Sequence, residues 1–209
     1  MKILLVGFGK MNKLIFDLYE ENIVGICDIY KEYINEAPDV IIDFSHKDYF
    51  FKLVELIEKF RCPVVIGTTN LEDEKIAQLQ EISKNIPILI SSNFSTGIYL
   101  LEKMFKENKN ILSLFDKEII ETHHKDKIHS PSGTSLALAD CLNTANITSI
   151  RIGDVVGVHE VILEKDYEVL SINHSVSNRC VYAIGAVNAA RWLINKENGL
   201  YSFGNLYES

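Results

Sequence analysis

Short apolar runs alternate with amphipathic stretches along the N-terminal part of the chain. The apolar runs hold four or five residues each and predict buried strands at Ile3–Val6, Ile23–Cys27, Val40–Phe44, Pro63–Ile66 and Pro87–Ile90. Apolar side chains at helical spacing lie between these runs and predict helices at Lys10–Glu21, Asp48–Phe60 and Glu72–Lys84. Continuous apolar strands that alternate with helices indicate a parallel sheet covered on both faces. Ligands bind such sheets beyond the carboxyl ends of the strands.

The pattern changes after Ser95. Helices are predicted at Thr96–Asn108, Ser132–Asn143 and Arg179–Lys196, a strand at Lys117–His123, and a hairpin of His159–Glu164 with Tyr167–His174 about a Lys165-Asp166 turn. We therefore expect an α/β chain with a Rossmann-type parallel sheet domain and a smaller α+β domain with a mixed sheet. The first domain is expected over residues 1–95, with the tail from about 185 to 209 returning to it, and the second over residues 96–184.

Composition narrows the class of protein. The chain has 209 residues, 47% of them apolar, and no apolar run approaches the ~18 residues needed to cross a bilayer. The apolar start is too short for a signal peptide, so we expect a cytoplasmic protein. The four cysteines form no CxxC pair, which suggests neither disulfides nor a zinc site. A net charge of −8 argues against a nucleic-acid surface.

A glycine-rich turn follows the first predicted strand and opens a helix. Gly7-Phe8-Gly9 would let the backbone approach a pyrophosphate, and Asp28 ends the second strand where it can bond a ribose hydroxyl. The usual third glycine is absent, with Asn12 near its place, and a plain strand-turn-helix is the alternative. The candidate cofactor-binding residues are Gly7, Phe8, Gly9, Lys10, Met11, Asp28, Gly67, Thr68, Thr69, Ser91, Ser92, Asn93 and Phe94. Asp28 favours NADH, whereas Lys10 and Lys31 can offset its charge, so NADH, NADPH or both are expected.

The segment from Glu121 to Thr134 is rich in side chains that can act in catalysis or bind a substrate. This segment holds two imidazoles, His123 and His124, several lysines including Lys127, and a Ser-Gly-Thr turn at a predicted helix start. Adjacent residues on a strand point to opposite faces, so the two imidazoles would be poor ligands for one metal ion, and we expect none. One imidazole can transfer a proton while the other binds substrate. Cationic side chains beside a helix N-terminus suit a small carboxylated molecule.

Other polar residues have weaker claims. Arg179, near the start of the last helix, is either a partner for a carboxylate or a surface arginine. Arg151 and His159 are secondary candidates, and His46 and His129 are expected at the surface.

The segment from Glu118 to Thr134 resembles the signature of the 4-hydroxy-tetrahydrodipicolinate reductase (dihydrodipicolinate reductase) family. Further matches follow in the family's order: Gly67-Thr68-Thr69, Asn93-Phe94-Ser95, Arg151-x-Gly153, Gly157-x-His159, Ser177-Asn178-Arg179 and Gly185-Ala186-Val187. Two residues depart from the family pattern: His129 replaces an aspartate and Asn12 a glycine. The chain is also short between Asp28 and Asp43, where one helical segment is trimmed.

The resemblance implies NAD(P)H-dependent reduction of 4-hydroxy-tetrahydrodipicolinate in lysine and diaminopimelate biosynthesis, by a homotetramer. It implies that His123 is the acid/base residue and Lys127 the proton donor. His124, Gly133 and Thr134 would hold a dicarboxylate substrate, with Ser132 and Arg179 as further candidates. Two alternatives stay open: a related amino-acid or semialdehyde dehydrogenase, or a nucleotide-sensing protein without catalysis.

Overall fold

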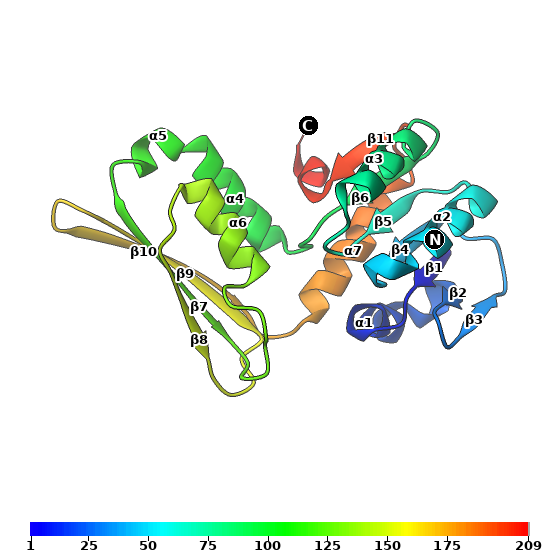
Figure 1. Cartoon of the computed structure of the whole chain (residues 1–209), viewed down its shortest axis with the longest axis horizontal. Coiled ribbons are helices and arrows are strands. Elements are labelled where there is room, and N and C mark those ends of the chain that lie inside the picture. Colours follow the sequence, from blue (N-terminus) through cyan, green and yellow to red (C-terminus); the bar gives the residue numbers. More distant parts are fainter. Residues whose placement is uncertain (209) are drawn as a thin grey trace. The chain divides into compact units, whose positions relative to one another are not determined.

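The computed structural model describes residues 1–208 and divides the chain into two compact units. The first unit comprises Met1–Phe94 and the chain from Cys180 onward, and the second comprises Ser95–Arg179. Figure 1 shows a separate sheet in each unit. None of the helices in the described residues is long and apolar enough to span a membrane.

The first unit is built on a sheet of seven described strands in the order β11-β6-β5-β4-β1-β2-β3. The strands are β1 (Ile3–Val6), β2 (Ile23–Cys27), β3 (Glu32–Ile34), β4 (Val40–Asp43), β5 (Val64–Ile66), β6 (Pro87–Ile90) and β11 (Gly199–Ser202). All neighbours run parallel except β2 and β3, which are antiparallel. The predicted parallel sheet is confirmed. The edge strands β3 and β11 were not predicted, because three or four residues with exposed polar positions carry no clear apolar run.

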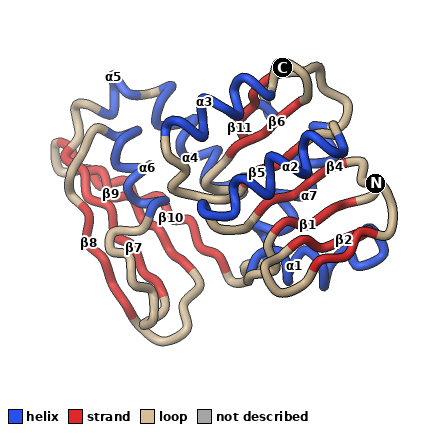
Figure 2. Tube along the Cα trace, turned by 45° about the vertical axis from the view of Figure 1, so that its right-hand side comes forward, coloured by secondary structure: helices blue, strands red, loops and turns tan. Residues whose placement is uncertain are grey.

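Helices cover both faces of this sheet (Figure 2). They are α1 (Lys10–Tyr19), α2 (Phe50–Phe60), α3 (Asp73–Ile82) and α7 (Cys180–Leu193), with short 3-10 turns at η1 (Glu20–Asn22), η2 (Lys47–Tyr49) and η3 (Phe203–Tyr207). Leu53, Leu56 and Leu79 of α2 and α3 belong to one buried cluster with the strands. Helix α7 packs against α1, β5 and β6. Between Asp28 and Asp43, where a helical segment was expected to be trimmed, the described chain has the strands β3 and β4 and no helix.

Close packing of α7 depends on a glycine. A Cβ atom on Gly185 would lie 1.9 Å from the carbonyl oxygen of Phe94. The helix also buries Ala186 and Ala190 fully. Small side chains therefore let the backbone of α7 approach the segment after β6 more closely than larger residues would allow.

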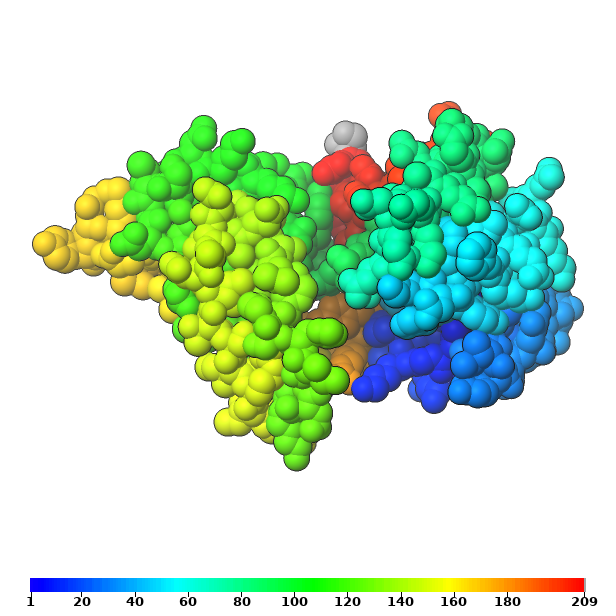
Figure 3. Space-filling view, in the orientation of Figure 1, coloured from blue at the N-terminus to red at the C-terminus, as the bar shows by residue number. Residues whose placement is uncertain are grey.

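The second unit has a mixed sheet of four described strands in the order β10-β9-β7-β8. Strands β7 (Asp116–His123), β9 (Gly157–Lys165) and β10 (Glu168–Val176) are antiparallel neighbours, while β8 (Ile147–Arg151) runs parallel to β7. The hairpin is confirmed, but its turn is Asp166-Tyr167, which takes positive φ angles of 52° and 73°. The tip of that hairpin forms the amber projection at the left of Figure 3.

One face of this sheet is covered by α4 (Thr96–Glu107) and α6 (Gly133–Leu142), with the short α5 (Lys109–Leu112) after α4. Phe105 of α4 and Leu138 of α6 meet Ile119 and Val161 in the core. Strand β8 and helix α5 were not predicted, since β8 alternates half-buried and exposed residues and α5 is a single turn. The strand β7 and the start of α6 flank the segment that carries the candidate chemistry.

Candidate active site

The glycine turn after β1, which was predicted to bind a pyrophosphate, requires glycine at its first position. Gly7 has a φ of 78°, and a Cβ atom there would lie 2.7 Å from the Cα atom of Ser45, so the position requires glycine. Gly9 is the residue before α1, and a Cβ atom there would have no neighbour within 4 Å. Asn12 is fully buried and its Nδ2 donates to the carbonyl oxygens of Val6 and Gly7, both at 2.7 Å. The Asn12 side chain, which stands in place of a glycine, therefore stabilises the turn by hydrogen bonds to its backbone.

Asp28 lies beside this turn at the end of β2. Its Oδ2 accepts a hydrogen bond from the backbone N–H of Phe8 at 2.8 Å, and its Oδ1 accepts one from the backbone N–H of Tyr30 at 3.2 Å. The ammonium groups of Lys13 and Lys31 each lie 5.9 Å from the centre of the Phe8 ring. The carboxylate that was predicted to bond a ribose therefore holds the backbone of the turn, and two ammonium groups lie near the Phe8 ring of the same turn.

A second polar group marks the end of β4. Asp43 is 1% exposed and accepts hydrogen bonds from Thr68 Oγ1 at 2.6 Å and from the Ser45 N–H at 3.2 Å. Burial raises the pKa of Asp43 despite these hydrogen bonds. Asp43 was not singled out from the sequence, because a carboxylate at a strand end is common. It fixes Thr68, one of the predicted cofactor residues.

The other predicted cofactor residues differ in exposure. Thr69 and Ser92 are exposed, whereas Ser91 and Asn93 are half-buried. These serines and Asn93 follow the end of β6, where Ser91 Oγ donates to the Asn93 carbonyl oxygen at 2.6 Å. Phe94 is 2% exposed, and its ring contacts those of Phe44 and Phe203 with centroid distances of 5.4 Å. Its ring serves the core of the first unit. The remaining predicted positions divide into exposed residues, Lys10 and Gly9, and half-buried ones, Phe8, Met11 and Gly67.

The second unit gathers its polar groups around Glu121, a buried carboxylate on β7. Among the described residues it accepts hydrogen bonds from the Ser132 N–H, from the hydroxyls of Ser135 and Ser149 at 2.9 and 2.8 Å, and from Arg151 Nη2 at 2.8 Å. Burial alone would raise the pKa of Glu121, but these hydrogen bonds outweigh it and hold the pKa well below its usual value. Glu121 is therefore a fixed buried anion.

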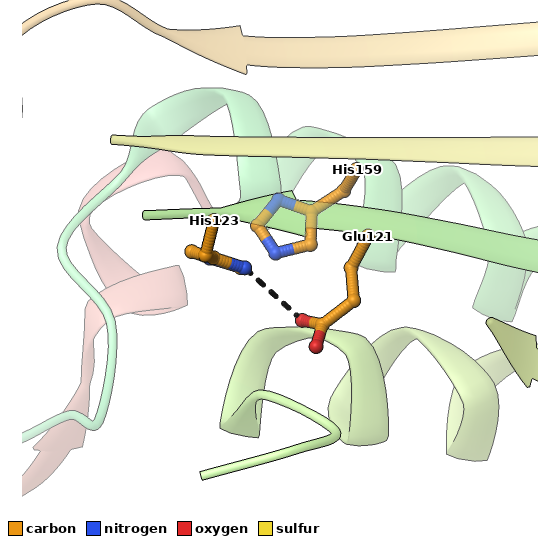
Figure 4. Close-up of side chains that lie close together, drawn as sticks. All are labelled: Glu121, His123 and His159. Carbon is orange, nitrogen blue, oxygen red and sulfur yellow. Dashed lines mark ion pairs between the residues drawn. The ribbon is translucent and has the colours of Figure 1, made fainter. Parts of the chain in front are cut away.

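Two imidazoles lie next to this anion, as Figure 4 shows. Nδ1 of His123 is 3.3 Å from Glu121 Oε2, and the His123 ring lies 5.2 Å from that of His159 with an angle of 72° between their planes. Nε2 of His159 is 3.4 Å from Ser132 Oγ. Burial, helped by the charge of Lys127, lowers the pKa of His123 to about 4, and burial next to His123 lowers that of His159 to about 4. Both rings are thus neutral at neutral pH.

The structure places His159 and Arg151, which had weaker claims from the sequence, beside Glu121. Their positions follow from strand pairing, since His159 lies opposite Glu121 across β9 and β7, and Arg151 lies opposite His123 across β8 and β7. The alternation Gly157-x-His159 on a strand was the available signal, because it places both residues on the buried face.

Lys127 lies in the loop between β7 and α6. Its backbone N–H donates to the His124 carbonyl oxygen at 3.1 Å, and the residue is half-buried. Burial lowers the pKa of Lys127, Glu121 opposes that shift, and the charges of Arg151 and Arg179 add to it. The structure therefore brings Lys127 into the electrostatic field of Arg179, which the sequence left undecided.

The remaining substrate candidates surround the start of α6. His124 and Thr134 are half-buried, and Gly133 is exposed with nothing within 4 Å of a Cβ atom built on it. Ser132, a further substrate candidate, is 1% exposed, and its hydroxyl caps α6 by accepting from the Ser135 N–H at 3.2 Å. Its side chain serves the helix start.

A metal ion has one candidate position among the described residues. Potential ligand atoms of Glu121, His123 and His159 lie within 4.8 Å of one another. The Glu121 carboxylate is already shared by four donor groups, one of them a guanidinium, and this arrangement suits a hydrogen-bonded network better than a cation. The two histidines that were expected at the surface, His46 and His129, lie outside this cluster.

Two models of one protein family match the N-terminal and the C-terminal parts of the chain. Residues 21–94 match the family model described as dihydrodipicolinate reductase, N-terminus, and residues 97–206 match the C-terminus of the same family. The chain belongs to the dihydrodipicolinate reductase family. The resemblance seen in the Glu118–Thr134 segment is confirmed.

Dihydrodipicolinate reductase relatives align over nearly the whole chain. The 4-hydroxy-tetrahydrodipicolinate reductase of Staphylococcus haemolyticus is 35% identical over 243 residues, covering 99% of this chain and 100% of the relative. That of Thermosipho africanus is 37% identical over 211 residues, covering 99% and 97%. The dipicolinate-bound dihydrodipicolinate reductase from Paenisporosarcina sp. TG-14 has the same fold, with a TM-score of 0.80 at 20% identity and 99% coverage of both chains.

Membership of the dihydrodipicolinate reductase family makes the chain an NAD(P)H-dependent oxidoreductase, as predicted. A semialdehyde dehydrogenase, one of the alternatives above, would more naturally carry a catalytic cysteine in a loop at a strand end. Cys27 and Cys62 are buried, burial raises the pKa of both thiols, and Cys141 and Cys180 lie in helices. The geometry and the family assignment both favour the reductase.

Proposed function

We propose that this protein reduces 4-hydroxy-tetrahydrodipicolinate to tetrahydrodipicolinate with NADH or NADPH, in lysine and diaminopimelate biosynthesis. The observation that carries the proposal is the buried imidazole of His123, whose Nδ1 lies 3.3 Å from Glu121 Oε2, with the half-buried Lys127 in the loop that follows β7. A homotetramer in the cytoplasm, acting on a small dicarboxylate and on no nucleic acid, completes the proposal. In it, the first unit binds nucleotide and the second binds substrate and forms the oligomer.

The residues of the first unit fit a nicotinamide dinucleotide. The Gly7 turn and the first backbone N–H groups of α1 would hold the pyrophosphate, and Asp28 would bond the adenosine ribose. Lys13 and Lys31, close to the Phe8 ring, would reduce the repulsion between Asp28 and a 2′-phosphate. When bound, the cofactor supplies the hydride.

The start of α6 would bind the substrate carboxylates. The N–H groups of Gly133 and Thr134 lie at a helix N-terminus, where partial positive charge favours an anion. His124 precedes them in the same loop, and Arg179 adds a guanidinium that can pair with a carboxylate in two hydrogen bonds.

Lys127 and His123 would carry out the proton transfer that accompanies hydride addition. Adding a hydride to a conjugated imine pushes electron density through the conjugated system, and protonation by Lys127 removes it. A lowered pKa makes the Lys127 ammonium a better acid than an ordinary lysine. A bound dianion raises the pKa of nearby cations, so substrate binding would keep Lys127 protonated until the transfer. His123, neutral before binding, can then accept or return a proton as the acid/base residue.

The decisive assay follows nicotinamide absorbance when purified protein meets cofactor and freshly generated substrate. Oxidation of the cofactor supports the reductase, and nucleotide binding without oxidation would support a sensor. His123→Ala and Lys127→Ala should each lower kcat by about 10² to 10⁴-fold, the range for loss of a general acid, while nucleotide Kd changes little. Lys125→Ala is the matched control, because Lys125 is exposed in the same loop. Equal losses of nucleotide binding and turnover in His123→Ala, or full activity of Lys127→Ala, would contradict these roles.

A further inference from the structure

Arg151, the last residue of β8, joins the buried anion to the backbone of the loop that carries Lys127. Nη2 of Arg151 donates to Glu121 Oε1 at 2.8 Å and to the carbonyl oxygen of His129 at 2.7 Å. Its Nε donates to the carbonyl oxygen of Lys127 at 3.3 Å, and its Nη1 donates to the carbonyl oxygen of Ile150 at 2.9 Å. One planar group therefore bonds the carboxylate and two carbonyl oxygens of the loop at once.

Apolar packing gives this loop little support. Lys125, Asp126, His129 and Ser130 are exposed, and Ile128 is 92% exposed. A segment that buries so little apolar surface must be ordered by polar contacts. Besides those of Arg151, the loop's backbone bonds include the Lys125 N–H to the Gly153 carbonyl oxygen at 3.1 Å and the Ser132 N–H to Glu121.

The same contacts explain the departure at His129. The network uses the carbonyl oxygen of that residue, and its side chain is exposed. Exchange of an aspartate for a histidine therefore leaves the bond to Arg151 in place.

We propose that Arg151 is a positioning residue that, anchored by Glu121, sets the backbone of residues 127–129 and thereby the place of the Lys127 ammonium group. This inference rests on the proposed role of Lys127 as proton donor. The role requires an arginine, since a lysine carries one compact ammonium group and cannot present the planar fork that meets three acceptors from one side. Displacement of a catalytic group by about 1 Å can cost about 100-fold in rate.

The test compares Arg151→Lys with Ser149→Ala. Arg151→Lys keeps a cation beside Glu121 and removes the fork, whereas Ser149→Ala removes another donor to the same Glu121 oxygen and leaves the bonds of Arg151 to the loop in place. Arg151→Lys should lower kcat by about 10 to 100-fold, with KM and nucleotide Kd changed by less than about 3-fold. Ser149→Ala should keep kcat within about 3-fold of the wild type, since it leaves the loop contacts intact.

Two further readouts separate positioning from a loss of folding. Free guanidinium should restore part of the kcat of Arg151→Ala and have no effect on Ser149→Ala. Hydrogen exchange of the amides of residues 125–132 should quicken in Arg151→Lys and stay unchanged in Ser149→Ala.

The outcomes distinguish this inference from the proposed function. A wild-type protein that never oxidises cofactor with this substrate would refute the proposed function, while the exchange of residues 125–132 would still decide whether Arg151 orders the loop. In an active protein, unchanged loop exchange in Arg151→Lys would overturn the inference. So would faster exchange with unchanged kcat, or an equal loss of kcat in Ser149→Ala.

Discussion

Acidification should destabilise this protein through its buried imidazoles. The pKa values of His123 and His159 are about 4 in the folded chain against 6.5 for an ordinary histidine. Between these values the unfolded chain binds protons that the folded chain does not, so stability falls as pH falls from about 6.5 to about 4. At about pH 5, which lies about 1.5 units below the pKa of an ordinary histidine, each buried imidazole lowers the free energy of unfolding by about 2 kcal/mol.

Other groups titrate in the same experiment. The lowered pKa of Glu121 adds to the loss only below its ordinary value of 4.5, and the raised pKa of Asp43 acts in the opposite direction. The difference between two variants is therefore more diagnostic than either curve. His159→Gln removes one imidazole and keeps a polar atom near Ser132, so its loss between about pH 7.5 and about pH 5 should be smaller than the wild-type loss by about 2 kcal/mol.

Urea unfolding at a series of pH values measures this difference. His129→Gln is the control, because His129 is exposed and its side chain lies outside the cluster of Glu121, His123 and His159. The reasoning would be refuted if His159→Gln lost as much stability as the wild type over this range, or if the wild type kept its stability to about pH 5.

Two predictions concern the first unit. Gly185→Ala forces a methyl group against the Phe94 carbonyl oxygen and should lower the free energy of unfolding by about 1–3 kcal/mol or more, measured in urea; wild-type stability would contradict the packing of α7. Asp28→Ala should move the ratio of kcat/KM for NADPH over NADH upward by about 10-fold, since it removes a carboxylate that repels the 2′-phosphate. An unchanged ratio would show that Asp28 serves only to hold the Phe8 N–H.

Apolar periodicity was sufficient for most elements of the fold. The five predicted strands of the first sheet and the β9–β10 hairpin were found within about two residues of their expected bounds. Strands β3, β8 and β11 were not predicted, because the sequence of a short strand with exposed alternate residues differs little from that of a loop. Their hydrogen-bonding partners are set by tertiary structure, and periodicity carries no information on such pairing.

The site residues that follow one another in the sequence could be predicted. Those that come together only through the pairing of strands could not. The Glu121–Thr134 segment is continuous, so its imidazoles and lysines could be assigned together. Arg151 and His159 reach Glu121 only through the register of β8 and β9 on either side of β7. The binding of Glu121 by four donor groups likewise depends on tertiary contacts that no local pattern encodes.

A titration of imidazole and lysine ammonium signals by nuclear magnetic resonance tests the central claim most directly. In the free protein the His123 ring should be neutral at about pH 7, with a pKa of about 4, and addition of pyridine-2,6-dicarboxylate should raise the pKa values of His123 and Lys127 together. A His123 ring that is protonated in the free protein at that pH, or two signals that the dicarboxylate leaves unmoved, would contradict the account.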